Sequence, residues 1–500
     1  MGETVFWTPG TKGVTHIACP DLSEGTDKIT VSPLYKLEPP TPRKDFPGLF
    51  EHQAEVVNTV EKHPNARLYL AWAPGLGKTL GSLASAAVSD NFPLVIVCPS
   101  VVKINWQRET EKWIGKEAQI LSSRTPSEIT SDVVIINYDV LDDWAETIIE
   151  MKPKAIVFDE AHYIKNPQSK RSKAAKMVGE EAEGMIFMLS GTPTPNSVHD
   201  LVMPLDVLGV LKHFGGRRPY VNRYCPPVQT RYGISYAKTH NRRELHENLK
   251  NSCLIRRRRE DCLDLPEKIR VHYPLKVEVP TNLKFYRPFL KLMNEGTLTE
   301  AKRVLDEEDS DNLHDEFLRE RLQVGKAKTP SIVELAGDTD EPLVIMVHHK
   351  EVVDELMKKL KKRKPVKLVG GMTPKARQAS IDAFMNGDTD IIICSITAAG
   401  VGINLQRGTQ MIIGELPFTY AEIEQAESRC HRSGAKNDLT VTTLVAIDTS
   451  DDVIQGVINR KEATSLEVED GEEVAPAPVR RDALARRLLR LYLTTPADLR

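Results

Sequence analysis

The segment LAWAPGLGKT at residues 70–79 decides the fold of this chain. It follows an apolar run and leads into a helical pattern, which is the setting that a phosphate-binding loop requires. Glycines let backbone amides converge on phosphate oxygens, and the helix that follows presents its positive end to the anion. Trp72 stands where the usual motif begins with glycine. A GKT or GKS triplet recurs by chance in roughly one chain of this length in five, so the loop alone is weak evidence.

A second segment, AIVFDEAH at residues 155–162, is an apolar run that ends in two carboxylates. At the end of a strand, Asp159 would bind Mg²⁺ directly or through its waters, and Glu160 would orient and deprotonate an attacking water. Lys78 would then reach the β- and γ-phosphates, and the Thr79 hydroxyl would ligate the metal. The alternative is a buried strand with a solvated acidic end. The phosphate loop upstream favours a site that hydrolyses ATP.

Short apolar runs alternate with amphipathic segments in two series along the chain. This pattern is typical of parallel sheets wrapped by helices. We therefore expect an α/β protein with two tandem lobes of mainly parallel sheet and a helical insertion between them. The first series is Leu68–Ala71, Leu94–Cys98, Val133–Ile136, Ala155–Phe158 and Ile186–Leu189, and the second is Leu343–Val347, Ile391–Cys394, Met411–Ile413 and Val441–Val445.

Composition and pattern divide the chain into five expected units. These are an N-terminal extension at 1–42, a first lobe with a helical extension at 43–275, a helical linker at 276–330, a second lobe at 331–465, and an acidic linker with a basic amphipathic helix at 466–500. That last helix, expected over Asp482–Leu493, has leucines on one face and arginines on the others. It would either dock against the protein or contact DNA, a membrane or a partner.

The composition is that of an ordinary globular protein, with 40% hydrophobic and 27% charged residues. No apolar run approaches the roughly 20 residues that cross a bilayer, and the N-terminal residues lack the basic start and apolar stretch of a secretory signal. The seven cysteines are scattered and never form a C-x-x-C pair, so neither a disulfide framework nor a zinc site is expected. The net charge of −3 does not exclude nucleic acid, because binding depends on local basic patches.

With these motifs in this order, the chain resembles superfamily-two helicases, and among them the Swi/Snf-type DNA translocases, from about Phe46 to Lys461. The resemblance implies two RecA-like lobes that share one ATP. LFEHQ (49–53) looks like the family's adenine-contacting element, with Gln53 on the base. CPS (98–100) and NWQRE (105–109) are similar to its first DNA-contacting motif. SGTP (190–193) resembles the motif that couples hydrolysis to lobe movement.

The second lobe carries further matches. SITAAGVGINL (395–405) looks like the fifth motif, which touches DNA phosphates and the ATP site, and QAESRCHR (425–432) matches the Q-x-x-x-R-x-x-R pattern of the sixth. On that match Arg432 is the arginine finger and Arg429 a second phosphate contact, and residues at i and i+3 share one face of a helix. A guanidinium from the opposite lobe would neutralise transition-state charge. The alternative is a solvated helix face.

Shorter matches narrow the resemblance to the annealing-helicase branch, whose members reanneal DNA or regress forks. They are LIRR (254–257), GKAK (325–328), HHK (348–350) and DTSD (448–451). Two basic runs have open interpretations. Lys358–Lys364 would suit a helix C-terminus or form a DNA patch. The four arginines of Arg256–Arg259 cannot all face one way on a helix, so at least one should meet phosphate or acidic side chains.

The expected site residues fall into five groups by role. The catalytic residues are Lys78, Asp159, Glu160, Gln425, Arg429 and Arg432. The ATP-binding residues are Gln53, Pro74, Gly75, Leu76, Gly77, Lys78, Thr79, Leu80 and Gly402, with Thr79 and Asp159 on Mg²⁺. The DNA-binding residues are Ser100, Asn105, Trp106, Tyr138, Arg257, His349, Lys350 and Thr397. The coupling residues are Ser190, Gly191, Thr192 and Gly400.

These residues predict a monomeric, ATP- and Mg²⁺-dependent motor on double-stranded or forked DNA, with no membrane partner. We expect it to be cytoplasmic, and so compact a motor would suit a bacterium or a phage-infected host. One alternative is a helicase that separates DNA or RNA strands. Another is a DNA-binding scaffold without catalysis, which would be expected to lose Lys78, Asp159, Glu160 or Arg432; all four are present.

Overall fold

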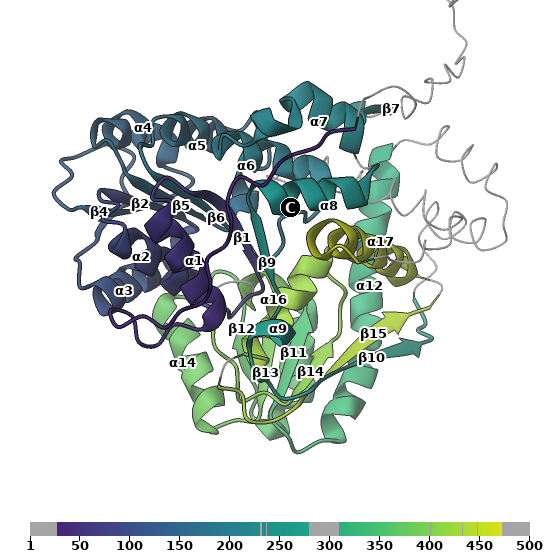
Figure 1. The fold of residues 1–500 in the computed structure, drawn as a ribbon. Coiled ribbons are helices and arrows are strands. Elements are labelled where there is room, and N and C mark those ends of the chain that lie inside the picture. Colours follow the sequence, from purple (N-terminus) through teal and green to yellow (C-terminus); the bar gives the residue numbers. More distant parts are fainter. Residues whose placement is uncertain are drawn as a thin grey trace, which may run out of the picture.

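The computed structural model describes residues 28–230, 233–236, 238–279, 310–399, 403–432, 434–447 and 449–472. They form two α/β lobes, one above the other in the view of Figure 1. The first lobe has a seven-stranded sheet in the order β3-β4-β2-β5-β6-β1-β9, and the second has a six-stranded sheet in the order β10-β15-β14-β11-β13-β12. All strand pairs within these two sheets are parallel. The predicted α/β class with two parallel-sheet lobes is confirmed.

Helices cover both faces of the first sheet, so its central strands are apolar except where Asp159 ends one of them. Its strands are β1 (Arg67–Trp72), β2 (Leu94–Cys98), β3 (Gln119–Leu121), β4 (Val133–Asn137), β5 (Ala155–Asp159), β6 (Met185–Leu189) and β9 (Leu254–Arg257). Its helices are α1 (Glu51–Lys62), α2 (Lys78–Val88), α3 (Lys103–Ile114), α4 (Leu141–Glu150), α5 (Lys170–Glu180), α6 (Val202–Val207), α7 (Arg217–Tyr224) and α8 (Arg242–Ser252). A small antiparallel hairpin, β7 (Val228–Thr230) and β8 (Gly233–Ser235), follows α7. Alternate residues of β2 enter two separate apolar cores, one on each face, as expected for a doubly covered sheet.

The second lobe repeats this plan with a smaller sheet. Its strands are β10 (Lys268–Leu275), β11 (Leu343–Val347), β12 (Val366–Leu368), β13 (Ile391–Ser395), β14 (Gln410–Ile413) and β15 (Leu439–Ala446). Its helices are α12 (Ser310–Gly337), α13 (Lys350–Lys359), α14 (Pro374–Asn386), α15 (Ile396–Ala399), α16 (Tyr420–Cys430) and α17 (Ser450–Ser465). The short helix α9 (Arg259–Cys262) lies where the chain crosses from β9 to β10.

Two expected boundaries of the second lobe are wrong. Strand β10 lies in the second sheet, paired with β15, so the first lobe ends before 275. Helix α12 was expected as a linker up to 330, but it runs on to Gly337 and packs in the second lobe. The buried ammonium of Lys328 donates to the carbonyls of Gly414 (2.9 Å) and Leu444 (2.8 Å) and pairs with Asp451. These contacts make the helix part of the lobe core.

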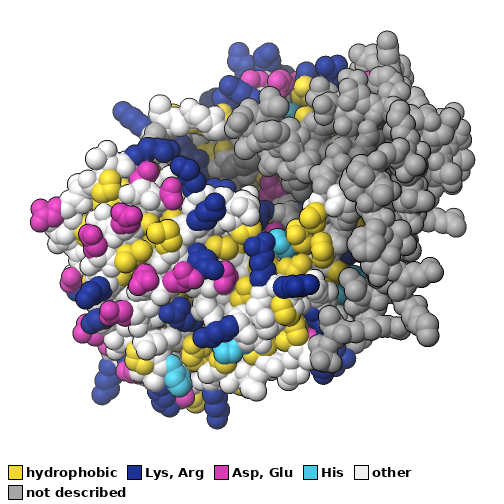
Figure 2. Space-filling view, turned by 90° about the horizontal axis from the view of Figure 1, so that it is seen from above, with side chains coloured by type: hydrophobic (Ala, Val, Ile, Leu, Met, Phe, Trp, Pro, Cys, Tyr) yellow, Lys and Arg dark blue, Asp and Glu magenta, His cyan; other side chains and the backbone are white. Residues whose placement is uncertain are grey.

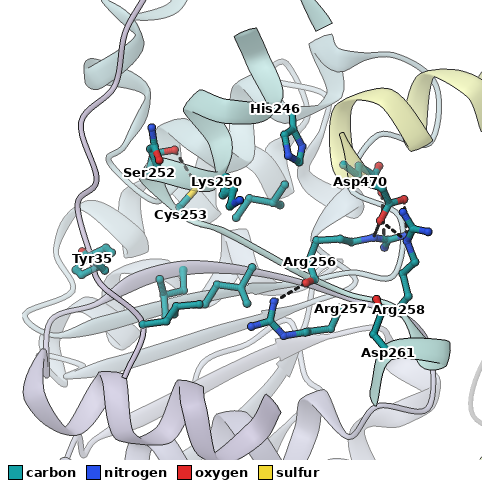
Figure 3. A pocket seen from close by; sticks show the side chains of 16 residues that line it. Tyr35, His246, Lys250, Ser252, Cys253, Arg256, Arg257, Arg258, Asp261 and Asp470 are labelled. Carbon is teal, nitrogen blue, oxygen red and sulfur yellow. Dashed lines mark hydrogen bonds and ion pairs between the residues drawn. The ribbon is translucent and has the colours of Figure 1, made fainter. Parts of the chain in front are cut away.

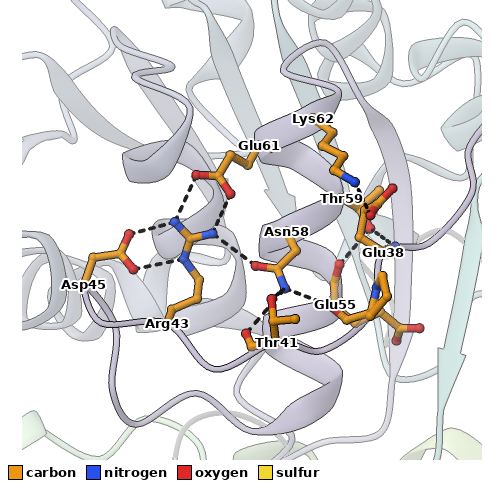
Figure 4. Close-up of polar contacts among 10 residues, drawn as sticks. Glu38, Thr41, Arg43, Asp45, Glu55, Asn58, Thr59, Glu61 and Lys62 are labelled. Carbon is orange, nitrogen blue, oxygen red and sulfur yellow. Dashed lines mark hydrogen bonds and ion pairs between the residues drawn. The ribbon is translucent and has the colours of Figure 1, made fainter.

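The ends of the described chain also pack on the first lobe. Residues 28–50 form an N-terminal strap, which the Arg43 guanidinium ties to α1 (Figure 4). Arg43 pairs with Asp45 (2.8 Å) and Glu61 (2.7 Å) and donates to Asn58 Oδ1 (3.0 Å). The expected extension at 1–42 is therefore folded from residue 28 onward. Residues 1–27 and the helix predicted at 482–493 lie outside the described residues.

The segment Leu466–Glu472, here called the return segment, comes back from α17 to the first lobe. Leu466–Asp470 forms a π-helical turn. Val468 is buried in the apolar core of the first lobe, and the buried Glu469 carboxylate accepts the backbone N–H of Thr194 at 3.1 Å. These residues were expected to begin an acidic linker, and the structure contradicts that for 466–470. In the described part of the chain, every helix is too short or too polar to span a bilayer.

Gly325 of α12 should be intolerant of a side chain. A Cβ at this position would lie 2.3 Å from Glu415 Oε1, and the Glu415 carboxylate is held by the backbone N–H groups of His348 (2.7 Å) and His349 (2.9 Å). We expect Gly325→Ala to lower the free energy of unfolding by about 1–3 kcal/mol through overpacking, measured by urea denaturation.

The matched control is Gly456→Ala in α17, because a Cβ there would meet no atom within 4 Å. It should stabilise the protein by up to about 1 kcal/mol through helix propensity. Equal effects of the two substitutions would contradict the packing argument.

Candidate active site

The phosphate loop has the predicted context between strand β1 and helix α2. Gly75 (φ +92°) and Gly77 (φ +71°) adopt left-handed backbone conformations that favour glycine. A Cβ at Gly77 would lie 2.2 Å from Nε2 of Gln53. Both glycines are therefore required by backbone geometry, and the loop leads into the first turn of α2, where a helix N-terminus favours an anion.

Lys78 and Trp72 are joined across this loop. The Lys78 ammonium donates to the Trp72 carbonyl at 2.8 Å. Burial lowers the pKa of Lys78, against the charges of Glu160 and Asp159. The Trp72 ring is buried, and Gly81 makes room for it, since a Cβ at Gly81 would lie 3.1 Å from Trp72 Cζ3. Trp72, which replaces the first glycine of the usual motif, is thus accommodated in the apolar core.

Gln53 lies against the loop. Its side chain donates to the carbonyls of Leu76 (3.1 Å) and Gly77 (3.3 Å) and accepts the N–H of Phe50 (3.0 Å). The neighbouring His52 ring nitrogen Nε2 is 2.9 Å from the Leu76 carbonyl. These bonds fix the loop. The adenine contact expected for Gln53 stays a prediction.

Asp159 ends strand β5, with both oxygens and its carbonyl held. Oδ2 accepts the indole N–H of Trp106 (2.8 Å), Oδ1 accepts the Glu160 N–H (3.0 Å), and the carbonyl accepts the Tyr138 hydroxyl (2.7 Å). Burial and the neighbouring Glu160 charge raise the pKa of Asp159 to about 6, while the Trp106 bond opposes this shift. Trp106 and Tyr138 are 1% and 2% exposed. The predicted contacts with DNA are therefore wrong for these two side chains, because Trp106 holds the Asp159 carboxylate and Tyr138 holds the Asp159 backbone carbonyl.

Glu160 has a left-handed backbone (φ +52°), a strained state for a residue other than glycine that tends to persist at functional sites. Burial raises its pKa, but His162, Lys78 and Arg429 lower it more, so the net shift is downward and the carboxylate stays ionised. His162 Nδ1 is 3.3 Å from Glu160 Oε2. Apart from this ion-pair contact, which lacks hydrogen-bond geometry, the buried Oε2 has no partner among the described residues, which suits a base that accepts a proton from a bound water.

Two arginines reach this site from the second lobe. A Cβ built on Gly75 would lie 3.9 Å from the Cβ of Arg432, so the expected finger stands beside the phosphate loop. Burial lowers the pKa of Arg429 to about 10, and the Glu160 charge opposes that shift. Helix α16 ends at Cys430. The prediction that Arg429 and Arg432 share a helix face is wrong, because Arg432 lies beyond the last turn.

The sixth-motif helix is anchored by a carboxylate that the sequence did not reveal. Glu427 of α16 is fully buried and accepts from Lys268 (3.1 Å) and twice from Arg270 (2.8 and 2.7 Å) of β10. Gln425 lies two residues earlier on the same helix, partly exposed. The missed signal was the alternation of basic residues in β10, whose partner follows far along the chain.

The coupling residues pack against the phosphate loop. A Cβ at Gly191 would lie 3.0 Å from Cδ of Pro74, and the Gly191 carbonyl accepts from Arg256 at 2.9 Å. The buried Ser190 hydroxyl accepts the Thr192 N–H at 3.1 Å. Gly400 and Gly402 lie outside the described residues, and Thr397 falls in α15.

The other expected DNA contacts have mixed surroundings. Ser100, Asn105 and Lys350 are exposed. The His349 ring is bound to the buried Glu415 carboxylate at 2.5 Å, and Arg257 pairs with Glu55. Figure 2 shows basic and acidic side chains side by side across the described part of one face, which agrees with the small net charge. These DNA contacts stay predictions.

The basic runs resolve partly into structural contacts. In the first run, Arg363 donates to the carbonyl of Thr339 (2.7 Å) and to that of Ala336, which favours the structural interpretation for this residue. In the second run, Arg256 and Arg258 pair with Asp470 at 2.8 and 2.9 Å. The prediction that at least one of these arginines meets an acidic side chain is confirmed.

The donor set fits Mg²⁺-nucleotide. Among the described residues no group of three or more His, Cys, Asp or Glu side chains could hold a metal. Mg²⁺ needs no such cluster, because it is usually held by one or two carboxylates together with phosphates and waters. Asp159 and the Thr79 hydroxyl, with the glycine-lined loop and the orphaned Glu160 oxygen, supply what such a group requires.

Two parallel-sheet lobes, with a phosphate loop on one and arginines delivered from the other, define a helicase-type ATPase core. Residues 52–318, more than half of the chain, match the family described as SNF2-related domain, and residues 327–434 match the helicase conserved C-terminal domain. The chain belongs to the SNF2-related family.

Its relatives include annealing helicases. It is 29% identical over 434 residues to a Caenorhabditis elegans homolog of SWI/SNF-related matrix-associated actin-dependent regulator of chromatin subfamily A-like protein 1 (83% of this chain, 61% of that protein). It is 25% identical over 421 residues to human DNA annealing helicase and endonuclease ZRANB3 (79% of this chain, 38% of that protein). A Sulfolobus solfataricus SWI2/SNF2 ATPase core, solved in complex with dsDNA, aligns over 87% of this chain and 96% of that one, at 22% identity and a TM-score of 0.41. The chain thus spans less than two thirds of the two curated relatives. Since these two are animal proteins, they give no support to the expected bacterial or phage host.

Trp106→Phe tests how Asp159 is held. It removes the indole donor from a half-buried carboxylate, so we expect the free energy of unfolding in urea to fall by about 1.5–3 kcal/mol. The pKa of Asp159 should rise further, because that hydrogen bond holds it down.

Trp113→Phe is the matched control, since Trp113 on the same helix donates its indole N–H to the Glu109 side chain nearer the surface. Its cost should be smaller, about 1.5 kcal/mol or less, because water can replace the lost donor at the more accessible Glu109 carboxylate. Equal losses would show that ring volume, and not the bond to Asp159, matters at both positions.

Proposed function

We propose that this protein is a DNA-dependent ATPase that moves on double-stranded or forked DNA and remodels forks or reanneals strands. One observation carries the proposal: Arg432 of the second lobe stands beside Gly75 of the phosphate loop on the first. A site completed across a cleft makes hydrolysis depend on lobe closure. Both halves come from one chain, which is consistent with a monomeric motor.

Five residues would carry the chemistry. Glu160, held ionised, would orient the attacking water and take its proton. Lys78 would exchange the Trp72 carbonyl for phosphate oxygens, and Arg432 would neutralise charge that develops on the transferred group. Asp159 and Thr79 would hold Mg²⁺, which when bound supplies positive charge to the phosphates. A scaffold without catalysis would not need this set.

Coupling to DNA would pass through groups that touch both the ATP site and the other lobe. Gly191 packs on Pro74, and Lys461 of α17 donates at 2.9 Å to Asn196, three residues after the SGTP motif, so this part of the chain joins the phosphate loop to the second lobe. Ser100, Asn105, His349, Lys350 and Thr397 are the proposed phosphate contacts. Such contacts carry no base information, so binding should be sequence-tolerant and salt-sensitive.

Fork remodelling or annealing is proposed from the relatives, of which the human protein is named a DNA annealing helicase. In the described residues we found no observation that favours strand separation over it.

Lys78→Ala and Arg432→Ala should each reduce ATP hydrolysis by about 10³-fold or more, because each removes a charge from the transferred phosphoryl group. DNA binding, measured by fluorescence anisotropy, should survive. Lys170→Ala is the control, as its side chain is 89% exposed, and it should hydrolyse ATP like the wild type. Full turnover by Arg432→Ala would remove the two-lobe mechanism.

The choice of nucleic acid can be tested by ATP hydrolysis without DNA and with single-stranded DNA, blunt duplex, forked DNA or RNA. Duplex and forked DNA should stimulate the rate most, and annealing should exceed unwinding in parallel strand assays. Stimulation by RNA or single strands, with none by duplex or fork, would instead favour the strand-separating helicase.

A further inference from the structure

We infer that Arg259 is a positioning residue that fixes the arginine finger relative to the phosphate loop. Its guanidinium makes one hydrogen bond to each lobe. Nε donates to the Pro74 carbonyl at 2.7 Å, and Nη1 donates to the His431 carbonyl at 2.9 Å. Pro74 directly precedes Gly75, and His431 directly precedes Arg432. One planar side chain thus spans the two backbones whose separation the hydrolysis site depends on.

The place of Arg259 in the chain suits this role. It begins α9, in the crossing between β9 of the first lobe and β10 of the second. Its residue is 4% exposed, so its bonds are shielded from water. A guanidinium is a rigid fork with donors in fixed directions, and bonds from a charged donor are stronger than neutral ones. Movement of one lobe against the other would break at least one of these bonds.

The electrostatic surroundings support a buried cation. Burial lowers the pKa of Arg259, while the charges of Glu424, Glu427 and Glu260 oppose the shift. Arg259 lines an interlobe cavity of about 220 Å³ together with Glu424, Glu427 and Arg270. The carboxylates come from α16, the helix that ends just before Arg432, so they also hold Arg259 close to the sixth motif.

The other three arginines of the run make different hydrogen bonds and ion pairs, although Arg256 and Arg258 also line the interlobe cavity. Arg256, Arg257 and Arg258 line a cavity of about 430 Å³ at the edge of β9 (Figure 3). Arg256 donates to carbonyls of the first lobe and to Asp470, Arg257 pairs with Glu55, and Arg258 pairs with Asp470 and Glu472. Among the four arginines of this run, Arg259 is the one whose hydrogen bonds reach both the phosphate loop and the sixth motif.

The inference rests on the proposed function, since Arg259 acts through Arg432. Loss of the Arg259 side chain removes no group that binds the nucleotide on the first lobe, so nucleotide binding by the first lobe persists. The Arg432 side chain, however, is no longer held in position relative to the phosphate loop. Misplacement of a catalytic group by about 1 Å can cost about 10²-fold in rate, so the effect falls on kcat.

The experiment compares Arg259→Ala, Arg259→Lys and the matched control Arg258→Ala. Hydrolysis is measured at saturating duplex DNA, and the dissociation constant of a fluorescent ADP analogue is measured without DNA. Arg259→Ala should lower kcat by about 10²-fold and change the dissociation constant by less than about fivefold, the weight of one hydrogen bond. The kcat of Arg259→Lys should lie between those of the wild type and Arg259→Ala, because an ammonium lacks the forked donors that reach both carbonyls. Arg258→Ala should keep a kcat close to that of the wild type.

Hydrogen exchange of the nucleotide-free proteins tests the link without any activity. Arg259→Ala should raise exchange in peptides that cover both 73–77 and 430–432, whereas Arg258→Ala should raise it at 466–472. A wild-type kcat in Arg259→Ala, an equal loss in Arg258→Ala, or faster exchange at 73–77 alone would overturn the inference. If wild-type protein hydrolyses no ATP with any nucleic acid, the proposed function fails, and the exchange pattern still decides the role of Arg259.

Discussion

Parallel strand pairing is the constraint on which the rest of this structure depends. Because β1 pairs with β6 and β6 with β5, all in parallel, the carboxyl ends of three strands meet at one edge. The phosphate loop, the two carboxylates and the Ser190 motif leave the sheet at that edge. Their charges then lie together in a partly desolvated place, where Lys78 and Glu160 shift each other's pKa. The second lobe supplies Arg429, whose charge lowers the pKa of Glu160, and it places Arg432 beside the phosphate loop, so both lobes contribute to the site at this edge.

The sequence was most informative where a motif follows a buried strand. The position of such a motif is determined, since a fully apolar run must lie inside the sheet and the loop that follows it must lie at the carboxyl end of the strand. The phosphate loop, Asp159 and Glu160 were found in this way. Strand β10 gave no such signal, because it lies at the sheet edge and nearly all of it is exposed. Its absence from the apolar series moved the expected lobe boundary to the wrong side of the strand.

The sequence also did not predict the direction in which some side chains point, or their distant partners. Trp106 stands among polar residues on α3, and its neighbour Asn105 is exposed, yet the indole turns inward to a carboxylate from β5. Helical periodicity was extended past Cys430, where the helix ends. The acidic return segment looked like a solvated linker, because its counter-charge, Arg256, lies 214 positions away from Asp470. Local pattern cannot supply partners at such separations.

The return segment also changes the kind of joint that connects the lobes. The polypeptide passes from the first lobe to the second after β9, and it comes back at Leu466–Asp470. Arg258, where the outgoing crossing starts, is paired with Asp470, where the returning one ends. A single connecting segment would let one lobe rotate relative to the other about any axis. Two connecting segments that are joined by an ion pair act as a hinge: they favour rotation of the lobes about one axis and oppose rotation about the others.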